Sequence, residues 1–86
     1  MKKLAPFALA LTLVASPVIA QEVAPGDRIG TDIGAISTAL SERGYEVRKT
    51  EREDGKVEVY AVREGRRFEI YVDPETGVVT RVKEKH

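Results

Sequence analysis

The first regular pattern in the chain is a set of apolar residues spaced three and four positions apart, as on one face of a helix: Ile33, Ile36, Ala39 and Leu40. Thr31 or Asp32 can cap this helix, and Gly44 is suited to end it in the left-handed conformation. The spacing predicts a helix from about Asp32 to Arg43. Gly34 lowers its intrinsic stability, so we expect packing against another element to hold it.

After Gly44 the period changes from helical to alternating. Apolar residues now alternate with Glu, Arg and Lys, as on strands with one buried face: Tyr45, Val47, Val57, Val59, Ala61, Phe68, Ile70 and Val72. Segments rich in turn residues separate these runs at 53–55, 64–65 and 73–77. We therefore expect an α+β fold, in which one N-terminal helix packs on one face of a three- to four-stranded antiparallel meander sheet.

The length of the first turn decides which residues share a face. A two-residue turn at 54–55 would place Val47 on the face opposite Val59. A three-residue loop at 53–55, with Gly55 in the left-handed position, keeps both valines on one face. The sequence therefore favours the three-residue loop.

The two later turns have clearer chemistry. A two-residue turn at 64–65 pairs Val59 with Ile70. In the turn at 73–77, Gly77 is expected to adopt a positive φ and to fix the final hairpin. The facing of the last strand, Val78 to Val82, stays open because its first two residues are both apolar.

The N-terminus has the pattern of a secretory signal peptide. Lys2 and Lys3 precede the apolar run 4–15, and small residues lead to an expected cleavage after Ala20. The run is shorter than the ~20 residues needed to span a bilayer. We therefore expect an exported protein in the periplasm or outside the cell, without stable membrane insertion. Residues 21–30 contain Pro and Gly but little periodicity, which predicts a flexible N-terminal arm.

The composition restricts both the stability and the partners of the mature chain. Without residues 1–20, 66 of the 86 residues remain, enough for one small domain at 31–83 followed by a frayed tail at 84–86. The chain has no cysteine, so neither disulfides nor a lipid on cysteine can support it. Of the 14 basic residues two fall in the signal, which leaves 12 against 14 acidic ones. Nucleic acid is therefore not an expected partner, and we expect a monomer or weak homodimer.

The residues offer little catalytic chemistry. The only histidine is His86 at the C-terminus, and a base-activated nucleophile or a typical metal site needs a positioned imidazole or thiolate. Glu51, Glu53 and Asp54 beside Gly55 could suggest a calcium loop, but the ligand spacing of such a loop is missing. A solvated hairpin turn is the favoured interpretation. We expect no enzyme, no cofactor and no metal.

The candidate site is the sheet face turned away from the helix. In the expected register this face carries Tyr60, Val62 and Tyr71, with Glu58, Arg67 and Glu69 around them, and the two tyrosines are diagonal neighbours. A single helix covers only one face of a sheet, and tyrosine suits interfaces. Two interpretations remain open: a partner-binding surface, or residues that merely favour strands.

The order of helix, Gly-Tyr and alternating strands, together with the ending Tyr71 to Val79 (YVDPETGVV), resembles the PepSY family. The likeness covers about Asp32 to Val82. The resemblance implies an α+β domain with an inhibitory or protein-binding role at the cell envelope. We therefore expect a non-enzymatic periplasmic module that binds an envelope protein, as a peptidase inhibitor or modulator. The alternative is a domain that binds a small ligand on its sheet.

Overall fold

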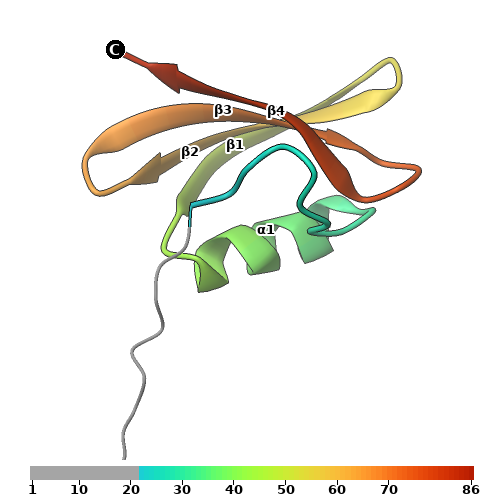
Figure 1. The fold of residues 1–86 in the computed structure, drawn as a ribbon, viewed down its shortest axis with the longest axis horizontal. Helices are drawn as coiled ribbons and strands as arrows, with labels where there is room; N and C mark the ends of the chain where they lie inside the picture. Colours follow the sequence, from blue (N-terminus) through green and yellow to red (C-terminus); the bar gives the residue numbers. More distant parts are fainter. Residues whose placement is uncertain (1–21) are drawn as a thin grey trace, which may run out of the picture.

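The computed structural model describes residues 22–86 and shows one helix against one four-stranded sheet (Figure 1). The elements are α1 (Ile33–Glu42), β1 (Glu46–Glu53), β2 (Lys56–Arg63), β3 (Arg66–Asp73) and β4 (Val78–Lys85). Every neighbouring pair is antiparallel, and the strand order is β1-β2-β3-β4. The α+β meander is therefore confirmed, with four strands. The expected signal peptide lies outside the described residues.

Helix α1 begins and ends at the expected signals. The Asp32 carboxylate accepts a hydrogen bond from the Ala35 N–H at 2.9 Å, which satisfies one of the free donors of the first turn. After the helix, Gly44 takes a φ of 90°. Ile36 and Leu40 are fully buried. The helical face read from the sequence is thus the face that packs on the sheet.

One hydrophobic core lies between α1 and the sheet. It is built from residues of the helix, of all four strands or their ends, and of the segment before the helix: Val23, Ile29, Ile36, Leu40, Tyr45, Val57, Val59, Ala61, Phe68, Ile70, Val72 and Val79. Partly buried Val47 and Val82 pack against it. The central strands supply most of these residues by strict alternation, as expected for strands with one covered face.

The first hairpin corrects the predicted loop. Glu53 pairs with Lys56, so the turn has two residues and the three-residue loop at 53–55 is wrong. Val47 nevertheless pairs with Ala61 on the core side. The register shifts between Val47 and Lys49, where a bulge adds one residue to β1. The bulge, rather than the length of the turn, therefore places Val47 on the same face as Val59.

The second hairpin has the expected two-residue turn. Glu64 and Gly65 have φ values of 55° and 76°, and Val59 pairs with Ile70. Two positive φ values in succession are the mark of the turn that matches the right-handed twist of a hairpin.

Strand β4 resolves the facing that the sequence left open. Val79 pairs with Val72 and Val82 pairs with Ile70, both on the core side, because the register shifts at Thr80. The strand also continues to Lys85, so the expectation of a frayed tail at 84–86 is wrong for Glu84 and Lys85, and only His86 lies beyond the strand. Its Glu84 receives two hydrogen bonds from the Arg66 guanidinium, at 2.7 and 2.8 Å.

Gly77 has the predicted positive φ, at 78°. A Cβ there would lie 3.2 Å from the carbonyl carbon and oxygen of Gly30. The carbonyl of Gly77 accepts the N–H of Ile29 at 2.7 Å. The turn is therefore also the point where the segment before the helix touches the last hairpin.

That segment corrects a third expectation, because residues 22–30 pack instead of forming a flexible arm. Val23 and Ile29 are buried, and Gly26 and Asp27 exchange backbone hydrogen bonds with Val79 at 2.8 and 2.7 Å. The Asp27 carboxylate accepts a hydrogen bond from Arg43 at 2.9 Å. The segment lies on the helix side of the sheet (Figure 1). It therefore completes the covered face and leaves the other face bare.

Candidate functional site

The face of the sheet turned away from α1, here called the open face, carries all four candidate residues. Tyr60 and Val62 lie on β2, and Arg67 and Tyr71 lie on β3. They alternate with core residues, so their side chains point to the opposite side. The register pairs Val62 with Arg67 and places Tyr60 and Tyr71 on a diagonal, as predicted. Within residues 22–86, the helix and the segment before it lie on the other face (Figure 1).

Two phenol–carboxylate pairs occupy the centre of the open face. The Tyr60 hydroxyl donates to Glu58 at 3.0 Å, and the Tyr71 hydroxyl donates to Glu69 at the same distance. Glu58 pairs with Tyr71, and Tyr60 with Glu69, across the strands. The four side chains therefore form a square in which glutamate and tyrosine alternate. Both glutamates are 7% exposed. The centre is therefore an ordered polar network and not the apolar strip that the tyrosines alone suggest.

Each hydrogen bond in this square changes the acidity of its members. The bond to Glu58, together with burial, raises the pKa of Tyr60 to about 12. The bond to Glu69, again with burial, raises the pKa of Tyr71 to about 12. Hydrogen bonds from Lys85 and then from Tyr71 lower the pKa of Glu69. At neutral pH the two phenols are therefore protonated and Glu69 is charged.

Cations surround the square. The Lys49 ammonium lies 5.7 Å from the centre of the Tyr60 ring, and Lys56 and Arg81 lie 5.3 and 5.7 Å from the centre of the Tyr71 ring. Such cation–π contacts are weak at exposed sites, about 0.5–1 kcal/mol. These contacts therefore stabilise the positions of the tyrosine rings only slightly.

A shallow pocket of about 250 Å³ lies at one end of the open face. The residues that line it are Arg48, Tyr60, Ala61, Val62, Arg67, Phe68 and Lys85. The pocket thus brings together three of the four candidate residues, and Tyr71 is outside it. Its lining combines the apolar surface of Val62 and the Tyr60 ring with three cationic side chains.

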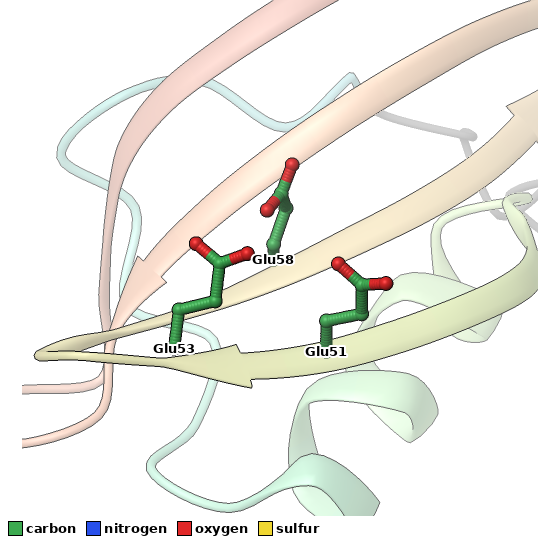
Figure 2. A group of neighbouring side chains, drawn as sticks. All are labelled: Glu51, Glu53 and Glu58. Atoms are coloured by element: carbon green, nitrogen blue, oxygen red, sulfur yellow. The ribbon is translucent and has the colours of Figure 1, made fainter.

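The opposite end of the open face is acidic. Oxygens of Glu51, Glu53 and Glu58 lie within 4.8 Å of one another, one carboxylate from each (Figure 2). Each carboxylate has a partner: Lys49 for Glu51 at 3.0 Å, Lys56 for Glu53 at 3.8 Å, and the Tyr60 hydroxyl for Glu58. Asp54, the third acid of the turn considered in the sequence, is not part of this cluster. Glu51 and Glu53 are therefore paired with lysines of the protein itself, and Glu58 accepts a hydrogen bond from a neutral hydroxyl.

The sequence interpretation placed Glu58 and Glu69 on this face but missed their hydrogen bonds to the tyrosines. Each glutamate stands two residues before a tyrosine, so the same Glu-x-Tyr pattern occurs on both central strands. That repeat was a usable signal for the square. Arg48 and Lys85 had no such signal, because a bulge and an unexpected extension of β4 bring them to the pocket.

Comparison with known proteins gives one match. A family model described as peptidase propeptide and YPEB domain matches residues 4–83, which confirms the predicted PepSY resemblance. No curated protein and no solved structure matches the chain. Among the described residues, no helix has the length and apolar character required to cross a membrane.

Proposed function

The chain belongs to the family of peptidase propeptide and YPEB domains, and from this membership we propose that it is a non-enzymatic module that binds another protein of the cell envelope through its open face. The partner class that the family suggests is a peptidase, which the module would inhibit or modulate. The signal-peptide pattern of residues 1–20 supports export to the periplasm.

The observation that carries this proposal is the unequal use of the two sheet faces. The helix and residues 22–32 both lie on one face (Figure 1). The other face holds two half-buried tyrosines in a fixed hydrogen-bonded square. Tyrosine is enriched among the residues that dominate binding energy at interfaces. An ordered tyrosine surface that nothing in the described chain covers is suited to a protein partner.

The protonation pattern supports binding in place of catalysis. A general acid or base works best when its pKa lies near the ambient pH. On the open face the pKa values are shifted away from neutral pH. Those of the Tyr60 and Tyr71 phenols are raised to about 12, and that of Glu69 is lowered. His86 lies in the exposed last position of the chain.

The alternative, a domain that binds a free small ligand, has less support. Typical small-molecule sites are enclosed clefts of about 300–1,000 Å³. The pocket beside Val62 and Arg67 has about 250 Å³ and is open to solvent on an otherwise broad face. Its size fits a single side chain of a larger partner better than a whole ligand.

Photo-crosslinking in the producing cell tests the proposal. Tyr71 is replaced by p-benzoylphenylalanine, which forms covalent bonds with whatever lies against it on irradiation. The matched control carries the same residue at Thr38, an exposed position of α1 on the far side of the molecule. Adducts are identified by mass spectrometry.

We expect a discrete adduct with an envelope protein from position 71 and none from position 38. If the adduct is a peptidase, purified protein should lower its activity, which tests the inhibitory role separately. Adducts from position 38 alone, or equal labelling at both positions, would contradict a role for the open face.

A further inference from the structure

The geometry points to a specific ligand for the pocket on the open face: we propose that it receives the C-terminal carboxylate of a partner polypeptide, with an apolar last side chain against Tyr60 and Val62. This inference rests on the proposed function and specifies what that surface recognises. It depends on three observations: an unpaired cation, a bulge and the size of the pocket.

The unpaired cation is Arg67. Among the described residues its guanidinium has no hydrogen bond or ion pair, although it is exposed and lines the pocket. Its direct neighbour across the strands is Lys85 on β4. Like charges opposite each other destabilise a sheet. The one carboxylate paired with these two cations is that of Glu69, 3.1 Å from the Lys85 ammonium. Arg67 and Lys85 together therefore leave positive charge for a bound anion.

The bulge in β1 brings the third cation. Arg48 is the extra residue between Val47 and Lys49, and it has no partner across the strand. A bulge redirects one side chain while the rest of the strand keeps its facing. Here it lets Arg48 line the pocket with Arg67 and Lys85. The Glu46 carboxylate, 3.3 Å from Arg48, is itself exposed, so this ion pair is easily exchanged for another carboxylate.

The apolar part and the size select the kind of anion. Val62 and the Tyr60 ring lie beside the three cations, so the ligand must present an apolar group and an anion close together. A volume of about 250 Å³ admits roughly one residue. In the last residue of a chain the carboxylate and the side chain share one Cα, whereas an internal Glu or Asp has no apolar group of its own at that distance. Guanidinium groups also bind carboxylates by two parallel hydrogen bonds.

A peptide titration tests the inference. The probe is an N-acetylated peptide of four glycines and a terminal leucine with a free carboxylate. One comparison peptide is the same chain amidated at its C-terminus, and a second is the amidated chain with glutamate in place of leucine. Binding to the purified ¹⁵N-labelled protein is followed by the NMR shifts of its backbone amides.

We expect the free-carboxylate peptide to shift the amides around Val62, Arg67 and Lys85, and to bind at least about tenfold more tightly than either amidated peptide. Arg67→Gln should weaken binding about tenfold, since a hydrogen bond to a charged group is lost. The matched control is Arg52→Gln, which removes an exposed arginine of β1 on the other face of the sheet and should leave binding unchanged. Tighter binding of the glutamate peptide, equal binding of all three, or no effect of Arg67→Gln would overturn the inference.

The same variants separate this inference from the proposed function. Tyr71 lies outside the pocket, and Arg67 lines it. If the Arg67→Gln variant gives the crosslink from position 71 at full yield and the peptide does not bind the wild type, the proposed ligand of the pocket is wrong. Partner binding through the open face is then supported. If position 71 gives no adduct while the carboxylate peptide binds, the pocket is a peptide site, and the proposed contact of an envelope protein with the open face around Tyr71 is wrong.

Discussion

The two faces of the sheet are built from the same strands and use opposite chemistry. On the covered face β2 and β3 contribute Val57, Val59, Ile70 and Val72, all fully buried under the helix and the segment before it. On the open face the alternate positions of these strands hold the square of Glu58, Tyr60, Glu69 and Tyr71. Alternation along a strand therefore places core residues and surface residues at neighbouring positions, and in the proposed function the surface residues contact the partner.

This separation matters because the domain is small. Small domains bury a limited share of their surface, and native proteins are only marginally stable. Substitutions on the covered face should consequently reduce stability strongly, whereas those on the open face should reduce binding with little loss of stability.

The largest effect should come from the covered face at Leu40. Leu40→Ala leaves a cavity at a fully buried position and should lower the free energy of unfolding by about 2–5 kcal/mol. Urea denaturation followed by circular dichroism measures the loss. Ser41→Ala, at the next and exposed helix position, is the control and should stay within about 0.5 kcal/mol of wild type. Equal stability of the two variants would contradict the assigned helix face.

Gly77 should come next, where the segment before the helix meets the last hairpin. Gly77→Ala places a side chain at positive φ and also 3.2 Å from the Gly30 carbonyl, so a loss of about 2–3 kcal/mol is expected. Gly55→Ala isolates the conformational part, because Gly55 has a φ of 71° with nothing within 4 Å of the added carbon. It should cost about 1 kcal/mol. Thermal unfolding of the pair gives the difference, and equal costs would show that the close approach does not matter.

A smaller effect is expected on the open face at Tyr71. Tyr71→Phe removes the hydroxyl that donates to Glu69, while Lys85 still pairs with that carboxylate. The loss of stability should be about 1 kcal/mol or less for this half-buried group. Phe68→Ala, on the core side of the same strand, is the control and should cost about as much as Leu40→Ala in the same denaturation assay. Similar losses for the two variants would remove the distinction between the faces.

The smallest effect at neutral pH comes from the acidity of the tyrosines and becomes visible only in alkali. Because their folded pKa values of about 12 exceed the usual 10, Tyr60 and Tyr71 contribute stability that is complete below about pH 10 and lost as the pH rises towards 12. Ultraviolet absorbance of tyrosinate should show this late ionisation. In Glu69→Gln, the pKa of Tyr71 should fall towards its usual value, and an unchanged titration would contradict the pairing.

Much of the fold follows from local sequence signals. The N-cap at Asp32, the buried helix positions Ile36 and Leu40, and the turn at 64–65 are each encoded by residues close in the chain. The placement of Tyr60 and Tyr71 on one open face follows from alternation alone. These features depend on periodicity and turn chemistry, which a single sequence records directly.

The features that escaped prediction depend on contacts between distant residues. The bulges at Arg48 and Thr80 shift the register of the two edge strands. They are needed only because valines on both sides of each shift must face the same core. The three-residue spacing of Val79 and Val82 was a usable hint of the second bulge. Val23 and Ile29 were not recognised as core residues because two isolated apolar positions have no period. The pocket was not predicted because the bulge at Arg48, which brings that side chain to it, was not predicted.

The most direct test of the account compares stability and partner capture in one double variant, Tyr60→Ala with Tyr71→Ala. The purified wild type and variant are immobilised in equal amounts, exposed to periplasmic extract, and the partner identified by crosslinking is quantified by mass spectrometry. We predict that the variant keeps a cooperative unfolding transition and recovers at least about thirtyfold less partner, since a tyrosine anchor can contribute 2 kcal/mol or more. Undiminished recovery by a folded variant would contradict the central claim that the open face is the binding surface.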